Sequence, residues 1–143
     1  MHTRRVVTCF LEHQGRLLLL RRSQKVRTYR GKWAGVSGSI ERESSSALEQ
    51  AFKEIAEETG MGAEDVELLR AGEPLEVVDS EHALSTAEGS AVKWLVYPFL
   101  FRVVHPTNIR LDWEHSECRW IYPEELPQLD TVPRLKETWE RLL

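Results

Sequence analysis

The sequence predicts an α/β fold in which helices cover a mixed β-sheet. Two features carry this prediction. Runs of apolar and β-branched residues typical of strands recur along most of the chain, and two segments have helical periodicity, one in the middle and one at the end. Because strands occur both before and after the first helix, strands and helices are expected to form layers around one sheet.

The N-terminal part predicts a β-hairpin followed by an irregular segment. The stretch RVVTCFLEHQGRLLLLRR contains two β-rich runs, and HQG between them supplies Gly15, which tolerates the positive φ of a tight turn. The next stretch, SQKVRTYRG, has no period and is expected to be a loop. KWAGVSGSI is expected to be a short strand segment that Gly35 and Gly38 interrupt.

The middle of the chain predicts a helix from Ala47 to Thr59. Ser46 and Glu49 form a capping-box pattern at its start, and Gly60 lies where a C-terminal cap belongs. At about 100° per residue, one arc of this helix is apolar and would pack on the sheet. That arc comprises Leu48, Ala51, Phe52, Ile55 and Thr59, and the neighbouring arc comprises Glu54, Glu57 and Glu58.

The second half predicts further strands and a terminal helix. VELLRAGEPLEVV and VKWLVYPFLFRVV are typical of strands. The polar loop that separates them is long, and loops of such length are often functional. Pro98 in the second run indicates an edge strand or a bulge. The segment from His105 to Glu117 is expected to be a loop. After it come a short strand at CRWIY, a helical turn at PEEL and a helix in VPRLKETWERLL.

Composition favours one globular domain over residues 1–143, since a chain that is 41% hydrophobic can bury a sizeable core. Its longest apolar runs are far shorter than the roughly 20 residues that cross a bilayer, so no membrane association is expected. The N-terminus lacks the apolar region of a signal peptide. The two cysteines, Cys9 and Cys118, fit a reducing compartment, with a single bridge left open. These features favour a cytoplasmic protein.

The net charge of −4 conceals two adjacent segments of opposite sign. Residues from His13 to Ile40 include seven basic and no acidic side chains, whereas Glu41 to Glu67 has nine acidic and two basic ones. Two solvated faces would explain such runs. A protein that binds a phosphate ester through a metal also needs both signs, carboxylates for the cation and Arg or Lys for the phosphate oxygens. Nucleic-acid binding is not expected, because the chain as a whole is acidic.

Three glutamates, Glu54, Glu57 and Glu58, share one face of the predicted helix. Their mutual repulsion needs an offset, which Lys53 supplies only in part. A solvated acidic face is one interpretation, and a divalent-cation site is the other. Carboxylates without His or Cys select hard ions, and Mg²⁺ shares its coordination shell with substrate phosphates.

The segment Gly38 to Met61 resembles the signature of the Nudix hydrolase family, G-x5-E-x7-R-E-U-x-E-E-x-G-U, in which U is a bulky aliphatic residue. The second half of this Nudix box matches apart from Lys for Arg, at Lys53, Glu54, Ile55, Glu57, Glu58, Gly60 and Met61. The segments Arg30 to Glu41 and Glu114 to Leu126 also resemble the family. The resemblance therefore covers most of the chain.

The first half of the box departs from the family pattern. Its Glu falls on Ser45 and its Gly on Ser39, whereas Gly38 lies one residue early, as if one residue had been inserted. Glu41 or Glu43 would then supply the missing carboxylate. Lys53 keeps the charge of the family's Arg and loses its planar fork.

The resemblance implies a Nudix-type α/β/α sandwich with a mixed β-sheet between helices. It also implies a Mg²⁺-dependent enzyme, with Mn²⁺ as an alternative ion, that hydrolyses the diphosphate linkage of a nucleoside diphosphate joined to another group. The expected metal ligands are Glu54, Glu57 and Glu58, and Lys53 would orient Glu54. The expected catalytic residues are Glu54, Glu57 and Glu117. Other acids compete with Glu117 for the loop position: Glu114, Asp112, Asp79 and Glu81.

The expected substrate-binding residues are Arg21, Arg30 and Lys32, which lie near the ends of segments that lead into the box. Trp33 and Trp94 either stack on a base or belong to the core. No site role is expected for three histidines and one cysteine: His82, His105 and His115 are expected in loops, and Cys118 is expected to be a buried apolar residue of a strand.

Two functional hypotheses follow. The first is the Mg²⁺-dependent hydrolase, supported by the intact second half of the box. The second is a non-catalytic Nudix-like module that binds a nucleotide or a protein, favoured by the altered first half. A diphosphate isomerase on the same fold would need a Cys- and His-rich site that the sequence lacks. A small nucleotide-type substrate is expected, and homodimers, common in the family, leave the oligomeric state open.

Overall fold

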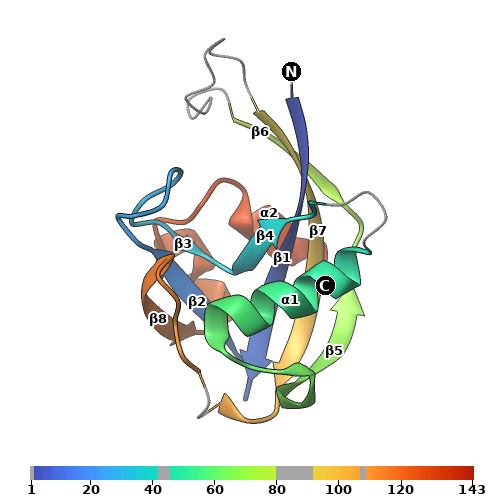
Figure 1. Ribbon diagram of the computed structural model, residues 1–143, viewed down its shortest axis with the longest axis vertical. Helices are drawn as coiled ribbons and strands as arrows, with labels where there is room; N and C mark the ends of the chain where they lie inside the picture. The colour runs from blue at the N-terminus through green and yellow to red at the C-terminus, as the bar shows by residue number, and fades with distance from the viewer. Residues whose placement is uncertain (1, 42–45, 80–91, 107–108) are drawn as a thin grey trace.

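A mixed β-sheet forms the centre of the molecule, with helices on both faces (Figure 1). The computed structural model describes residues 2–41, 46–79, 92–106 and 109–143. The strands are β1 (His2–His13), β2 (Arg16–Arg22), β3 (Trp33–Ala34), β4 (Val36–Ser39), β5 (Val66–Ala71), β6 (Leu75–Asp79), β7 (Val92–Val103) and β8 (His115–Ile121). The helices are α1 (Ala47–Thr59), α2 (Leu135–Glu140) and the 3₁₀ helices η1 (Ala63–Asp65) and η3 (Pro123–Gln128).

Strand β1 organises the sheet because it pairs with three other strands. One edge pairs in parallel with β7 from His2–Val92 to Glu12–Arg102. The other edge pairs with β4 from Val6 to Cys9 and with β2 from Leu11 to His13. The sheet therefore divides beside β1. Strands β3 and β8 extend the β2 branch, whereas β5 and β6 share the far edge of β7.

Alternating side chains on the strands build a core on each face of the sheet. On β2, Leu18 and Leu20 face a core that includes Ile55 of α1, whereas Leu17 and Leu19 belong to a second core that includes Leu135 of α2. In Figure 1, α1 lies in front of the sheet and α2 behind it. The predicted α/β/α sandwich is confirmed.

Local sequence signals set both ends of α1, as predicted. The side chain of Ser46 accepts a hydrogen bond from the backbone N–H of Glu49 (3.0 Å). At the other end, Gly60 adopts a left-handed conformation with φ 78°, and its N–H donates to Ala56. Because both ends of the helix are fixed, its glutamates take defined positions relative to the sheet.

Pro98 lies in a central strand and not at a sheet edge, which corrects one part of the prediction. Strand β7 has β1 on one side and two strands in succession on the other. Pairing with β6 ends at Val96, pairing with β5 begins at Phe99, and the carbonyl of Pro98 accepts from Gly72 N–H (3.0 Å) between them. The missing N–H of proline is tolerated because the partner strand changes at this point.

Two further expectations differ from the structure. Cys118 is exposed on β8, an outer strand of the sheet, and is not a buried apolar residue. The expected loop from His105 to Glu117 ends earlier, since β8 already begins at His115. Within the described residues, no helix is long and apolar enough to span a bilayer.

Replacing Ser46 by Ala should destabilise the fold by about 1 kcal/mol, because the N–H of Glu49 loses its cap. Urea denaturation of both proteins would measure the difference. The matched control is Ser116→Ala on exposed β8, which should unfold like the wild type. Equal midpoints for Ser46→Ala and the wild type would contradict the role of the cap.

Candidate functional site

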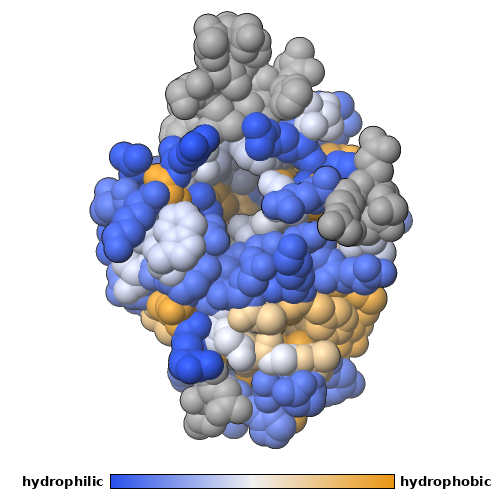
Figure 2. All heavy atoms as spheres, viewed as in Figure 1, coloured by the Kyte–Doolittle hydropathy of each residue, from blue (hydrophilic) through white to orange (hydrophobic). Residues whose placement is uncertain are grey.

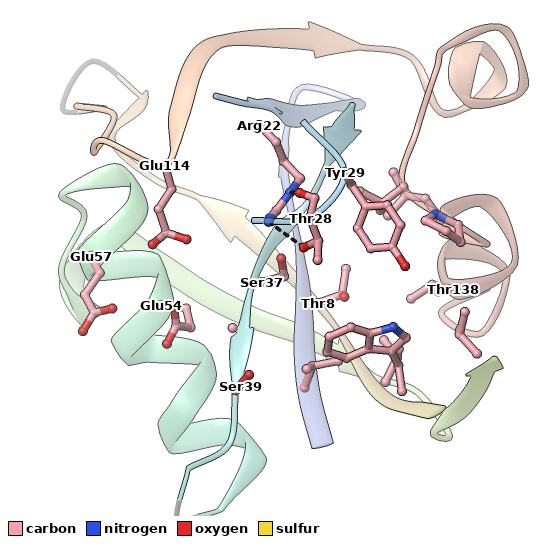
Figure 3. Close-up of a pocket in the computed structure, with 18 of the residues that line it drawn as sticks. Thr8, Arg22, Thr28, Tyr29, Ser37, Ser39, Glu54, Glu57, Glu114 and Thr138 are labelled. Atoms are coloured by element: carbon pink, nitrogen blue, oxygen red, sulfur yellow. Dashed lines mark hydrogen bonds between the residues drawn. The ribbon is translucent and has the colours of Figure 1, made fainter. Parts of the chain in front are cut away.

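A cavity of about 390 Å³ opens between α1, the β1–β4 pair and α2 (Figure 3). Its wall on the α1 side is acidic, with Glu54 and Glu57 on the helix and Glu114 on the segment that enters β8. The opposite end is mostly apolar and is lined by Val6, Val77, Trp94, Val96, Val132 and Leu135. The cavity therefore joins a carboxylate cluster to an apolar recess.

Glu54 lies against Gly38 of β4, where a larger residue would displace its side chain. A Cβ atom at position 38 would overlap the carboxyl end of Glu54. Gln50 Nε2 donates a hydrogen bond to Oε2 of Glu54 (2.6 Å), and the Glu54 side chain is also hydrogen-bonded to Glu58. Gly38 therefore contacts Glu54, the first glutamate of the second half of the box, although Gly38 lies one residue early in the family pattern.

Glu58 is buried beneath this cluster and is 1% exposed. The backbone N–H of Ser37 donates to its Oε1 (3.3 Å), whereas its Oε2 has no hydrogen-bond partner among the described residues. Burial is the largest cause that raises the pKa of Glu58 to about 10, and the neighbouring carboxyl groups of Glu54 and Glu114 contribute to this rise. Without a cation, the raised pKa favours a proton on Glu58.

His115 lies behind Glu58, at the start of β8, and is 6% exposed. Its Nδ1–H donates to Oδ1 of Asp112 (3.0 Å), which leaves Nε2 directed at Oε1 of Glu58, 3.5 Å away. Burial lowers the pKa of His115, and the hydrogen bond to Asp112 opposes this effect. His115 is thus a buried partner of the cluster and not the loop histidine expected from the sequence.

Glu114, at the other side of the acidic wall, is influenced by the charge of Arg22. Burial raises the pKa of Glu114, Asp112 raises it further, and Arg22 opposes both. Arg22 is fixed by Thr28, whose carbonyl accepts from Nε (2.8 Å) and whose hydroxyl accepts from Nη2 (3.2 Å) (Figure 3). Among the described residues that line the cavity, Arg22 carries the only positive charge.

The basic residues expected to bind substrate lie elsewhere. Arg21 forms an ion pair with Glu117 (2.9 Å), Lys32 forms one with Asp130 (2.7 Å), and Arg30 donates to the carbonyl of Val26 (2.7 Å). None of these residues is among the described lining of the cavity. Glu117 is outside that lining as well, whereas its competitor Glu114 is within it.

Some of the remaining sequence candidates line the cavity and others do not. Trp94 lines the cavity, and Trp33 belongs to the core beneath α2. Lys53 is exposed on α1, while Glu41 lies at the cavity. Other candidates lie outside the described residues: Glu43, Ser45, Glu81 and His82. The backbone of Asp79 is described as part of β6.

Arg22 was missed because of a local irregularity in the sheet. The pairing of β2 with β8 shifts register between Arg21 and Arg22. Such a shift changes which of two adjacent side chains faces the site, and alternation along the strand does not reveal it. His115 was missed because its only available signal, a nearby Asp in the same segment, also fits an exposed loop.

The cluster suits a hard divalent ion in its chemistry but does not form a ready-made cage. In the described part of the chain, no three His, Cys, Asp or Glu side chains are arranged to hold an ion. The acidic wall nevertheless offers carboxylate oxygens alone, and the buried Oε2 of Glu58 has no partner. A cation beside that oxygen would satisfy it, so Glu54, Glu57 and Glu58 fit such a group.

Comparison with known proteins gives a consistent family. The family model described as NUDIX domain matches residues 1–142. An RNA pyrophosphohydrolase from Novosphingobium aromaticivorans is 32% identical over 103 residues, which are 65% of this chain and 62% of that protein. The chain thus spans less than two thirds of that relative's length.

Solved structures share the fold over nearly the whole chain. The MutT protein from Methanosarcina mazei has a TM-score of 0.73 and 25% identity, with 98% of this chain and 92% of that chain covered. An Ap4A hydrolase from C. elegans in a binary complex has a TM-score of 0.68 and 16% identity, with coverage of 99% and 94%. At 16% identity the likeness concerns the fold alone.

Replacing Glu58 by Gln should stabilise the metal-free protein, increasingly so at high pH. Because the folded pKa of about 10 exceeds the ordinary value of 4.5, the wild type loses stability as pH rises between these values. Glu54, Glu114 and His115 face the same carboxyl group. We expect the variant to gain at least about 1 kcal/mol relative to the wild type between pH 5.5 and pH 8.5.

Thermal melts in EDTA at both pH values would measure this change. Glu57→Gln is the matched control, because Glu57 is exposed on the same helix and its removal relieves no buried charge. A difference between Glu58→Gln and the wild type that stays constant with pH would contradict the assignment of the buried proton.

Proposed function

Since this chain belongs to the NUDIX family, we propose that it is a Mg²⁺-dependent hydrolase that cleaves the diphosphate linkage of a nucleoside diphosphate derivative. One observation carries the proposal: a single cavity joins the acidic wall of α1, the cation Arg22 and an apolar recess. These three parts match the metal-bound diphosphate, the remaining phosphate oxygens and the base of such a substrate.

Substrate binding uses the two ends of the cavity differently. The guanidinium of Arg22 binds phosphate oxygens, and its bonds to Thr28 hold it in place before substrate arrives. At the other end, Trp94 and the valines beside it exclude water from an aromatic base. The volume of about 390 Å³ lies near the lower end for small-molecule sites and supports a substrate with one base at a time in the recess.

Glu54, Glu57 and Glu58 would hold a divalent ion through their carboxylate oxygens. Such an ion would neutralise charge at the phosphoryl oxygens and favour deprotonation of the attacking water. The oxygen of water forms a new bond to phosphorus, the bond from phosphorus to the bridging oxygen breaks, and that oxygen leaves with the other phosphate. The attacking water loses a proton to a carboxylate of the cavity.

Glu114 is the carboxylate that we assign to this proton transfer. It belongs to the same acidic wall as Glu54 and Glu57, and its carboxylate points toward the helix that carries them (Figure 3). Its raised pKa makes it a better base near neutral pH than an ordinary glutamate. Glu54 is less available, because Gln50 and Glu58 already occupy its carboxyl group.

The catalytic assignment is preferred to the binding-module alternative because the altered first half of the box leaves the acidic wall intact. Gly38 still packs on Glu54, and Glu41 lies at the cavity beside them. A relative that is an RNA pyrophosphohydrolase supports diphosphate chemistry. A cytoplasmic location and a homodimeric state stay predictions.

Hydrolysis of a panel of diphosphate-linked nucleosides should require Mg²⁺, and Glu57→Gln should lower kcat at least a hundredfold, about 2.7 kcal/mol of barrier. Glu57 is exposed, so the fold should be unaffected. Glu49→Gln, an exposed glutamate in the first turn of the same helix, is the control and should retain wild-type turnover. No turnover by the wild type on any substrate would favour the binding module.

Arg22→Ala should raise KM at least tenfold, since it removes the positive charge of the cavity lining. Arg21→Ala is the neighbouring control, because its partner Glu117 lies outside the lining, and its KM should stay within about twofold of the wild type. Steady-state kinetics on the best substrate of the panel would measure KM for both variants and the wild type. Equal effects of the two variants would contradict the assignment of Arg22.

A further inference from the structure

Strand β8 has one edge without a partner strand in the described part of the chain. Its other edge pairs with β2, from Leu17–Ile121 to Arg22–His115. Figure 1 shows β8 at the margin of the molecule, and residues 116–119 on this strand are exposed. The unpaired N–H and C=O groups of such an edge are a template for a further strand.

Two exposed aromatic side chains lie at the ends of this edge. Trp113, two residues before β8, is 62% exposed, and Tyr122, directly after it, is 47% exposed. The carbonyl of Trp113 accepts a hydrogen bond from Ser23 Oγ (2.9 Å), and the guanidinium of Arg16 lies 4.9 Å from the centre of the Tyr122 ring. Aromatic residues are enriched in protein–protein interfaces. The edge and both of its ends therefore have the features of a docking surface.

We propose that this edge of β8 pairs with the same edge of a second copy of the chain, in an antiparallel dimer with its two-fold axis at Cys118. A two-fold axis perpendicular to the sheet joins identical edges and makes the two strands antiparallel. Cys118 is the central residue of β8, so an axis at this position lets all seven residues of the strand pair.

The charges of the edge favour this register. Glu117 of each copy lies opposite Arg119 of the other copy, and opposite charges in directly facing positions stabilise a sheet. Arg119 has no ion-pair partner among the described residues, and Glu117 is paired only with Arg21 on the adjacent strand. A shift of two residues would place either Glu117 opposite Glu117 or Arg119 opposite Arg119, so the neighbouring registers are disfavoured.

The exposed aromatic side chains come together in the same register. Position 114 lies opposite Tyr122 of the second copy, which brings Trp113 next to that ring at both ends of the interface. A ladder of seven residues is short for a stable interface, even with aromatic contacts at its ends. We therefore expect a dimer that dissociates on dilution.

The charge pattern supplies a matched pair of variants. Arg119→Glu makes the edge acidic and Glu117→Arg makes it basic, so each variant should repel its own copy, whereas an equimolar mixture restores opposite charges at both facing pairs. Lys136→Glu is the control, because it makes the same change in net charge as Arg119→Glu on exposed α2, away from the edge.

Sedimentation equilibrium of the full chain in reducing buffer would measure the dissociation constant of the dimer. We expect each edge variant to weaken self-association at least about tenfold, and the mixture to associate within about threefold of the wild type. Lys136→Glu should associate like the wild type.

Disulfide cross-linking tests the register. Directly opposite cysteines on antiparallel strands lie within the span of a disulfide. Glutathione disulfide should therefore link Cys118 of the two copies by thiol–disulfide exchange, in which both thiols lose their protons and the oxidant leaves as two molecules of glutathione. Cys9 is buried and should not react.

The cross-linking control is Ser116→Cys in a Cys118→Ser background. Position 116 lies opposite position 120, so its two copies are about 14 Å apart and should not link. Non-reducing electrophoresis would detect both products.

A wild-type chain that stays monomeric and forms no link through Cys118 would overturn the proposal. A dimer that both edge variants leave unchanged would also overturn it, because its interface would lie on another surface. Equal linking through positions 116 and 118 would contradict the register.

Discussion

The packing of α1 on β4 is the constraint on which the rest of this structure depends. Ala51 and Ile55 anchor the helix in the core, and this orientation brings the carboxyl groups of Glu54 and Glu58 to the seam with the strand. Burying two adjacent carboxyl groups is unfavourable unless a proton or a cation lies between them. The helix cannot rotate to expose them without losing its apolar contacts. Packing in the core therefore keeps the two carboxyl groups buried next to each other.

Some charged residues in the described part of the chain form surface ion pairs, whereas the cavity contains an excess of carboxylates. Arg21 and Lys32 each have an acidic partner near the surface, where such pairs add little stability. Their pairing leaves the cavity with several carboxylates facing Arg22. The potential inside the cavity is consequently negative, which attracts cations and would repel a free polyphosphate. On this reasoning, metal binding is a condition for substrate binding as well as for chemistry.

Sequence patterns predicted what local interactions determine. The span of α1 followed from its caps and apolar arc, and the β1–β2 hairpin followed from its turn glycine. Membership of the family followed from the second half of the box. The rest depended on long-range register: the shift beside Arg22 directs that side chain to the cavity, and the early start of β8 buries His115. Neither the register shift nor the start of β8 can be recognised from the periodicity of the sequence. Cys118 was misassigned because alternation does not distinguish an outer strand from a central one.

The parallel pairing of β1 with β7 also governs when the site can exist during synthesis. Helix α1 has local end signals, but a helix of 13 residues is only marginally stable before it packs on the sheet. The first strand, however, must wait for a partner that begins at Val92 and ends at Val103. Closing such a distant contact is slow compared with helix formation. For much of its translation, the nascent chain therefore displays its glutamates without the cavity that gives them a function.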